Sequence, residues 1–201
     1  MSAYPIALNG HRVRALVVGG GSVGTRKALA LLEAGADVRV VAPEISAELA
    51  KVEAENRLSV LRAPYAPDAL GDATVVIAAT SSRDVNSVVA ADARARGKLV
   101  NVADAPDEGD FHSMAVHRSG DLTIAVSAGG VPGAAARIRD SLAIRFDERY
   151  ERALSALHRM RSRLRAADGD AWHRAAPELI GEDFCESVEK GALPEKVAAW
   201  R

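Results

Sequence analysis

Cysteine is nearly absent from this sequence: Cys185 is the only one among 201 residues. A single cysteine excludes an internal disulfide and a metal site built from several cysteines. No apolar run approaches the roughly 20 residues that a transmembrane helix requires. The first residues, MSAYPIALNGHRVR, also lack the basic and apolar blocks of a secretory signal peptide. We therefore expect a cytoplasmic globular protein with no membrane partner.

A charge excess of either sign is also absent. The chain has 26 Lys and Arg residues and 27 Asp and Glu residues, which gives a formal net charge of −1. No global field therefore attracts nucleic acid, and no nucleic-acid partner is expected. Hydrophobic residues make up 48% of the chain, which is enough to bury one or two small cores.

The first hundred residues alternate between strand and helix patterns. Strands are predicted at 13–18, 37–42, 58–63, 74–79 and 99–102, and helices at 22–33, 47–55 and 83–96. The run 74–79 is almost wholly apolar, which is typical of a strand buried on both faces of a sheet. On the helix 83–96, one stripe is predicted to contain Val85, Val88, Val89 and Ala93. The alternation predicts an α/β fold with a parallel, doubly wound sheet of Rossmann type.

The pattern changes near residue 111. Two extended runs, 113–118 and 122–127, are joined by Ser119-Gly120, which predicts an antiparallel hairpin. A helix is predicted at 134–146, and a helical tail follows from the spacing of Tyr150, Leu154, Leu157 and Leu164. We predict a Rossmann-type domain at 1–110, a small hairpin-and-helix segment at 111–147 and a helical C-terminal domain at 148–201.

A glycine-rich turn separates the first predicted strand from the first predicted helix. The residues Gly19-Gly20-Gly21-Ser22-Val23-Gly24 fit the dinucleotide fingerprint G-x-G-x-x-G. Gly19 permits the tight turn, Gly21 lets the backbone approach a pyrophosphate, and Gly24 lets the helix pack closely on the strand. The helix N-terminus offers N–H groups and a partial positive charge to the phosphates. All six residues are candidate cofactor contacts, and an ordinary structural turn is the alternative.

The cofactor expected at this turn is NAD. In such folds an acid near the end of the second strand binds the adenosine ribose. Here the strand ends at Val41-Ala42-Pro43, and the first acid is Glu44. Glu44 is either this ribose ligand or a solvent-facing acid that starts the next helix. Arg62 remains an alternative contact for the phosphate of NADP, and Thr80, directly after the strand 74–79, is added as a cofactor contact.

A second constellation follows the strand 99–102. That strand delivers Asn101-Val102-Ala103-Asp104-Ala105-Pro106 to the carboxyl edge of the sheet, where ligands of such folds bind. A carboxylate at Asp104 would accept a proton while hydride leaves a neighbouring carbon. The alternative is that Asp104 caps a turn or helix before Pro106.

Five segments occur together in one order: VVGGGSVGTRKALALLEAGADVRVVAPE, VVIAATSSRDVN, NVADAPDEGDF, LTIAVSAGG and ARIRD. In combination they resemble precorrin-2 dehydrogenase, the oxidase module of siroheme synthase. The resemblance implies NAD-dependent oxidation of precorrin-2 to sirohydrochlorin, for siroheme or another modified tetrapyrrole. It also implies a homodimer in which the central segment forms much of the interface. It makes Asp104 the residue implicated in dehydrogenation and, in bifunctional members, in metal chelation.

The sequence departs from the family pattern near the substrate site. Relatives carry a stretch similar to S-S/T-G-G-x-S-P where this chain has Ser127-Ala128-Gly129-Gly130-Val131-Pro132-Gly133. After Phe111, an apolar run is replaced by His112-Ser113-Met114. Two alternatives therefore stay open: a sirohydrochlorin metal chelatase, and a non-catalytic relative that binds NAD or a tetrapyrrole.

Precorrin-2 carries eight carboxylates, so its binder needs cationic partners. Arg137 is a candidate, although a solvated surface arginine is equally consistent with its position. His112 and Ser127 are further candidate substrate contacts. His112 and His117 are five residues apart on a predicted strand and so lie on opposite faces. No metal ligand is therefore assigned.

Overall fold

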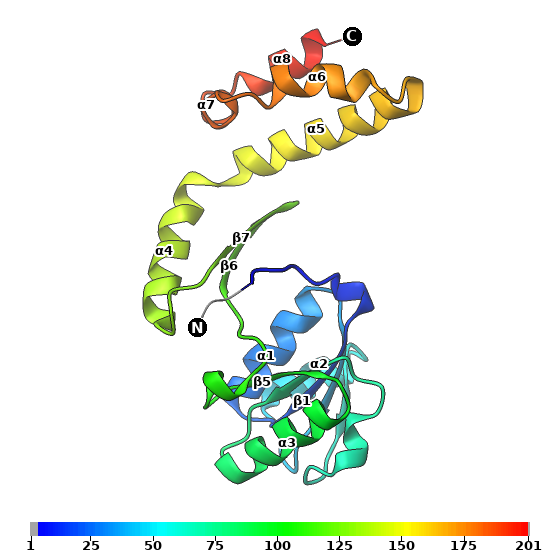
Figure 1. The fold of residues 1–201 in the computed structure, drawn as a ribbon, viewed down its shortest axis with the longest axis vertical. Coiled ribbons are helices and arrows are strands. Elements are labelled where there is room, and N and C mark those ends of the chain that lie inside the picture. The colour runs from blue at the N-terminus through cyan, green and yellow to red at the C-terminus, as the bar shows by residue number, and fades with distance from the viewer. Residues whose placement is uncertain (1–3, 201) are drawn as a thin grey trace. The chain divides into compact units, whose positions relative to one another are not determined.

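The computed structural model describes residues 4–200 (Figure 1). They form two compact units that divide between Ser113 and Met114. The further division near residue 147 stays a prediction. Within residues 4–200, no helix combines the length and apolar character needed to cross a membrane.

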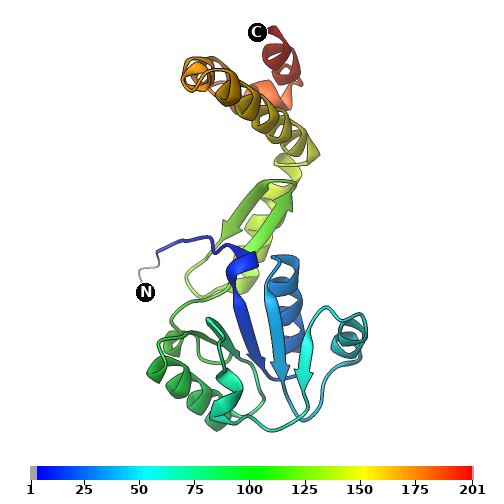
Figure 2. The ribbon, with the colours of Figure 1, turned by 90° about the vertical axis from the view of Figure 1, so that its right-hand side faces the viewer.

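The first unit is an α/β domain with a five-stranded sheet. Its strands are β1 (Arg14–Val18), β2 (Asp37–Val41), β3 (Ser59–Leu61), β4 (Val75–Ala78) and β5 (Leu99–Val102). Every strand pair is parallel, and the order is β3-β2-β1-β4-β5; Figure 2 shows β1, β2 and β3 running the same way. The predicted parallel, doubly wound sheet is confirmed. The strand order reverses at β1, so the carboxyl ends of β1 and β4 form the switch point where ligands of such sheets bind.

Helices cover both faces of this sheet. They are α1 (Ser22–Glu33), α2 (Ala47–Ala54) and α3 (Arg83–Ala95), with short 3-10 helices η1 (Gly10–Arg12), η2 (Pro67–Leu70) and η3 (Pro106–Glu108). Alternate residues of β1 enter different cores: Val17 packs with Ala28 of α1, and Val18 packs with Val89 of α3. Figure 1 shows α1 and α3 on opposite sides of the strands. Burial on both faces explains why the strands are almost wholly apolar.

The stripe predicted on α3 is wrong at Val88, whereas Val89 and Ala93 are buried and Val85 packs against the same core. Val88 is 52% exposed, whereas the buried face of the helix consists of Asn86, Val89, Ala90 and Ala93. The spacing of the valines predicts that Val88 lies on the packed face of the helix, because apolar residues usually face the core. The packed face instead includes Asn86 and Ala90 beside Val89 and Ala93, and Val88 faces outward.

The second unit begins with the predicted antiparallel hairpin, which is confirmed. β6 (Ala115–Ser119) pairs with β7 (Leu122–Val126), and Ser119 lies opposite Leu122. The two-residue loop is therefore Gly120-Asp121, one position later than predicted. Gly120 has a φ of +55°, a left-handed conformation that glycine adopts without strain.

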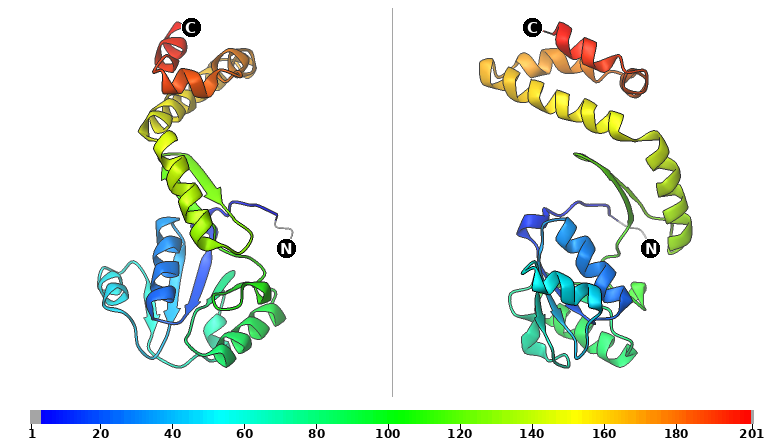
Figure 3. Two further views of the ribbon diagram at one scale, coloured as in Figure 1. Left: turned by 90° about the vertical axis from the view of Figure 1, so that its left-hand side faces the viewer. Right: turned by 180° about the vertical axis from the view of Figure 1, so that it is seen from behind.

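The rest of the second unit is helical, as predicted. α4 (Pro132–Arg145) packs on the hairpin, and α5 (Glu148–Ala167) is covered by α6 (Ala171–Leu179), α7 (Phe184–Glu189) and α8 (Leu193–Ala199) (Figure 3). The core of this helical part includes Tyr150, Leu157, Met160 and Leu164 of α5. Together with the buried Ala153 they recur every three or four residues, which places them on one side of the helix.

Candidate cofactor and active site

The glycine-rich turn connects β1 to α1 at the switch point of the sheet. Gly19 has a φ of +121°, and a Cβ atom there would lie 2.3 Å from the carbonyl oxygen of Ala79. A Cβ atom at Gly20 would lie 2.2 Å from the Glu44 carbonyl oxygen, and one at Gly24 would lie 2.0 Å from that of Gly19. Any larger residue at these three positions would therefore displace backbone.

Gly21 differs from its neighbours because its surroundings are open. A Cβ atom at Gly21 would meet no atom within 4 Å, and Gly21 is the N-cap of α1. No side chain caps α1, whereas Ser46 caps α2 and Ser82 caps α3 by accepting backbone N–H bonds. The first N–H groups of α1 thus lack the side-chain partner that the other two helices of this unit have. This arrangement fits a bound pyrophosphate.

Two hydroxyl groups hold the turn against the start of α2. The Thr25 hydroxyl donates to the Gly21 carbonyl at 2.9 Å and contacts the Ser46 hydroxyl at 2.8 Å. The Ser46 backbone N–H also donates to the Gly20 carbonyl at 3.0 Å. The turn is therefore fixed by the protein's own hydrogen bonds, which reduces the entropy lost when a ligand binds.

Glu44 and Arg62 lie at the carboxyl ends of neighbouring strands, β2 and β3. Glu44 is exposed and follows Pro43 in a bend. Arg62 donates from both terminal nitrogens to Glu53 of α2, at 2.8 and 2.5 Å. These hydrogen bonds lower the pKa of Glu53 and keep it ionised. Arg62 is thus already paired with a carboxylate.

Thr80 follows β4 and is partly buried. Its backbone N–H and its hydroxyl donate to Oδ1 of Asn86, at 3.0 and 2.8 Å. Its carbonyl accepts from Nδ2 of Asn86 at 3.1 Å. The Thr80 loop is therefore held by one side chain of α3, directly beside the Ala79 carbonyl that Gly19 packs against.

Asp104 lies between β5 and η3, with 39% of its side chain exposed. Oδ1 accepts from Nδ2 of Asn86 at 2.9 Å and lies 3.9 Å from the guanidinium of Arg83. Arg83 also forms an ion pair with Glu108, and this hydrogen bond raises the pKa of Arg83. The N-cap of η3 is Ala105 and receives no side-chain hydrogen bond, so the Asp104 side chain does not cap this helix.

Sequence reasoning missed Asn86, which links two of the predicted site residues. Asn86 is fully buried, and its side chain bonds both Thr80 and Asp104. The available signal was a lone asparagine within the apolar repeat of α3. Burying an amide is costly without hydrogen bonds, so a polar residue at such a position indicates specific partners.

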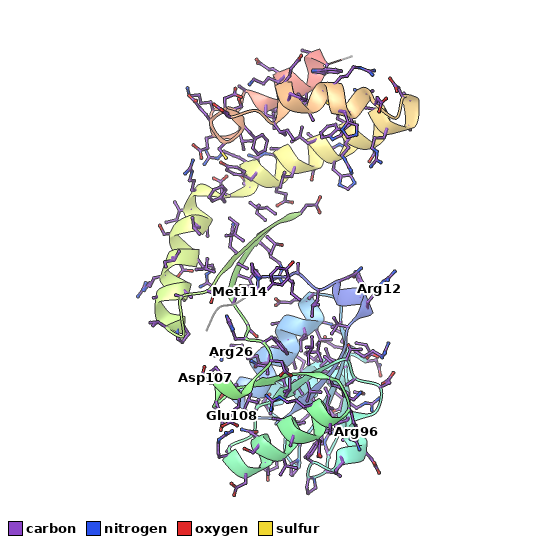
Figure 4. The ribbon with its side chains drawn as sticks, viewed as in Figure 1. Arg12, Arg26, Arg96, Asp107, Glu108 and Met114 are labelled. Atoms are coloured by element: carbon purple, nitrogen blue, oxygen red, sulfur yellow. The ribbon has the colours of Figure 1, made fainter. Side chains whose placement is uncertain are left out.

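Sequence reasoning also missed Lys27, on the second turn of α1. Burial lowers the pKa of Lys27, and the neighbouring Arg26 lowers it further. Its ammonium donates to the Ser113 hydroxyl at 2.8 Å. Among residues 4–200, no carboxylate forms an ion pair with Lys27 or Arg26. Figure 4 labels Arg26 on α1 and Asp107 and Glu108 on η3.

The candidate substrate residues belong to both units. His112 is exposed in the segment after η3, at the end of the first unit. Ser127 directly follows β7, and Arg137 is exposed on α4, so both belong to the second unit. His117 of β6 is bonded to the Phe146 carbonyl at 2.6 Å. Among the described residues, no three His, Cys, Asp or Glu side chains are grouped to hold a metal ion.

The strand order and the glycine turn define a dinucleotide-binding domain of Rossmann type. A family model described as putative NAD(P)-binding matches residues 6–115. The siroheme synthase of Chromobacterium violaceum is 39% identical over 199 residues, which cover 98% of this chain and 41% of that protein. The siroheme synthase of Methylobacillus flagellatus is 35% identical over 199 residues, covering 96% and 43%. This chain thus spans less than half the length of these curated relatives.

A solved structure extends the similarity over almost the whole chain. SirC, a precorrin-2 dehydrogenase, matches with a TM-score of 0.76 and 28% identity, covering 96% of this chain and 98% of that chain. The chain belongs to the putative NAD(P)-binding family, and over almost its whole length it is similar to siroheme synthases and to a precorrin-2 dehydrogenase. The resemblance predicted from the sequence is confirmed.

Proposed function

We propose that this chain catalyses the NAD-dependent dehydrogenation of precorrin-2 to sirohydrochlorin. One structural observation carries the proposal. At the switch point of the sheet, Gly19 packs on the Ala79 carbonyl, and the adjoining Thr80 is joined through Asn86 to Asp104. A dinucleotide turn and a partly exposed carboxylate therefore share one edge of the domain. The similarity to siroheme synthases and to SirC supports the choice of substrate.

The reaction removes two hydrogens from the substrate, one as hydride and one as a proton. A bound NAD⁺ would supply the hydride acceptor. The carboxylate of Asp104 accepts the proton and later returns it to water. The products are sirohydrochlorin, NADH and one proton, so atoms and charge balance. Among residues 4–200, no side chain bonds Oδ2 of Asp104, so that oxygen is available to the substrate.

NAD rather than NADP is the cofactor in this proposal. The turn from Gly19 to Gly24, including Gly20, Gly21, Ser22 and Val23, would hold the pyrophosphate, with Thr80 near the nicotinamide side. In this proposal Glu44, three residues past the end of β2, would bind the ribose hydroxyls and repel a 2′-phosphate. Arg62, the alternative phosphate ligand, is already paired with Glu53.

The substrate's carboxylates need cations at the site. Lys27 is suited to this role because its ammonium is partly buried and pairs with no carboxylate among the described residues. A substrate carboxylate would supply the missing counter-charge. His112, Ser127 and Arg137 remain proposed substrate contacts, on the basis of the family resemblance.

The proposal includes a cytoplasmic homodimer. Ile138 and Ile144 of α4 are 48% and 81% exposed, and Val131 before this helix is 57% exposed. Exposed apolar side chains on one segment are typical of an association surface. This supports the expectation that the central segment meets a second copy of the chain.

The test is an anaerobic assay with precorrin-2 and NAD⁺, so that oxygen cannot replace the cofactor as oxidant. We expect NADH and sirohydrochlorin to form together. A parallel assay with sirohydrochlorin and ferrous iron, without NAD⁺, separates dehydrogenation from chelation. Metal insertion without any NADH formation from precorrin-2 would instead favour a chelatase. Tetrapyrrole binding without either reaction would favour a non-catalytic relative.

A further inference from the structure

Asn86 is a completely buried amide on the face of α3 that packs against the sheet. An asparagine side chain offers two N–H donors and a carbonyl oxygen with two lone pairs. All of this capacity is used. Oδ1 accepts from the backbone N–H and the hydroxyl of Thr80, while Nδ2 donates to the Thr80 carbonyl and to Oδ1 of Asp104.

These four bonds connect two loops that are distant in sequence. Thr80 follows β4 and Asp104 follows β5, so both lie at the carboxyl edge of neighbouring strands. Three of the bonds fix the Thr80 loop. The fourth leaves this loop and reaches a carboxylate that is 39% exposed and has access to water. This bond also satisfies the second N–H of the buried amide, and its acceptor lies outside the Thr80 loop.

The fourth bond sets the orientation of Asp104. It fixes the rotation of the carboxyl group through Oδ1 and leaves Oδ2 for a reacting partner. The other charged groups facing Asp104 are Arg83 of α3, at 3.9 Å, and Glu108 of η3, which pairs with Arg83. The charge of Arg83 is balanced by its ion pair with Glu108. The Asn86 amide, at 2.9 Å, is therefore the group that bonds the Asp104 carboxylate directly.

We propose that Asn86 is a positioning residue that orients Asp104 and couples it to the cofactor-side Thr80 loop. This inference rests on the proposed function, because it assigns Asn86 a part in the same dehydrogenation. It makes Asn86 part of the proton-accepting arrangement without contact to the substrate. Its removal should change how Asp104 responds to pH, which loss of stability alone would not do.

The main test is Asn86→Asp, which keeps the side-chain shape and places a second carboxylate beside Asp104. We expect kcat to fall by about 10- to 100-fold, because a hydrogen bond to a charged group is lost. The acid limb of the kcat/KM profile should also move to higher pH, because like charges disfavour the ionised form. The matched control is Asn101→Asp, since Asn101 is a buried asparagine of β5 that bonds the Phe111 carbonyl and not Asp104. The control should keep the wild-type acid limb.

A second variant covers the case in which Asn86→Asp does not fold. In Asn86→Ser the new side chain is small and polar, and its hydroxyl is too short to bond both Thr80 and Asp104. It should shift the acid limb in the same direction by a smaller amount, with thermal unfolding used to verify the fold. A folded Asn86 variant with the wild-type kcat and acid limb would overturn the inference.

A measurement without turnover separates this inference from the proposed function. The carboxyl carbon of labelled aspartate reports titration of Asp104 by NMR, and Asp104→Asn identifies its signal. We expect the Asp104 signal to titrate at higher pH in Asn86→Ser than in the wild type. An unchanged titration overturns the inference even if the enzyme proves active. A shifted titration supports the Asn86–Asp104 link even if precorrin-2 is not the substrate.

Discussion

The two compact units differ in how completely they bury their own side chains. All of β4 is buried in the first unit, and so is β1 apart from Arg14. In the second unit, no residue of β6 or β7 is fully buried, and α4 buries only Ala135. In the first unit, the strands that lead to the carboxyl edge of the sheet are thus held by contacts within that unit. The hairpin and α4 of the second unit leave apolar side chains exposed. We infer that the chemistry depends on the first unit and that assembly depends on the second.

Asp104→Ala should produce the largest effect. Loss of a general base lowers kcat by about a thousandfold, while NAD⁺ binding and the oligomeric state should remain those of the wild type. The measurement is steady-state NADH formation from precorrin-2. Asp107→Ala is the control, because Asp107 is an exposed acid on the adjoining η3. Equal loss in both variants would contradict a specific role for Asp104.

Gly24→Ala and Gly21→Ala should differ because their surroundings differ. A Cβ atom at Gly24 would lie 2.0 Å from the Gly19 carbonyl oxygen, whereas the space at Gly21 is open. Overpacking at Gly24 should cost about 1–3 kcal/mol of stability and also weaken NAD⁺ binding. Gly21→Ala should keep the wild-type Tm and weaken NAD⁺ binding at least about tenfold, or roughly 1.4 kcal/mol. Calorimetric titration and thermal unfolding check both variants. Unchanged NAD⁺ affinity in Gly21→Ala would argue against a pyrophosphate at this turn.

Ile144→Asp tests the assignment of assembly to the second unit. Ile144 is 81% exposed in the isolated chain. If two copies bury this side chain, a charge there should weaken dimerisation by at least about 100-fold. Sedimentation over a concentration series measures the change. Val88→Asp is the matched control, because Val88 is an exposed apolar residue of the first unit. Dissociation in the control alone would reverse the comparison between the units.

Lys27→Met tests whether the first unit binds a substrate carboxylate. Loss of the ammonium should raise the KM for precorrin-2 about tenfold, because a charge-assisted hydrogen bond is removed. Lys27→Arg should restore most of the affinity, and the KM for NAD⁺ should not change in either variant. Steady-state kinetics at two salt concentrations measure these values. A raised KM for NAD⁺ alone would assign Lys27 to the cofactor instead.

Glu53→Ala is expected to have the smallest effect. It releases Arg62, which can then meet the 2′-phosphate of NADP⁺, and the KM for NADP⁺ should fall by about two- to fivefold. Glu48→Ala, on the same helix, is the control. If the KM for NADP⁺ is the same in both variants, pairing of Arg62 does not set the cofactor preference.

The strands and helices of the first unit were predicted closely because local sequence patterns determine them. The strand Leu99–Val102 and the helix Ser22–Glu33 have the predicted bounds. Apolar runs between glycine and helix signals specify such elements without long-range information. The glycine turn, Thr80 and Asp104 were predicted as site residues in the same way, since each lies within two residues of the end of a strand.

The contacts that join these residues were not predictable from local patterns. Asn86 bonds Asp104 across 18 residues of sequence. The apolar spacing of α3 placed Val88 on the packed face, whereas in the structure Asn86 is buried there and Val88 is exposed. Arg62 was left open as a phosphate ligand because its partner Glu53 lies nine residues away on another element. Lys27 likewise gave no signal, because its hydrogen-bond partner Ser113 lies 86 residues away in the sequence. Pairings of this kind are set by tertiary packing, which residue spacing does not encode.

The most direct test of the central claim is product stoichiometry under anaerobic conditions. Wild-type protein is mixed with precorrin-2 and NAD⁺, and NADH and sirohydrochlorin are measured in the same sample. The account predicts one NADH for each sirohydrochlorin, since one hydride leaves each substrate molecule. Folded protein that binds NAD⁺ but forms no NADH from precorrin-2 would contradict it.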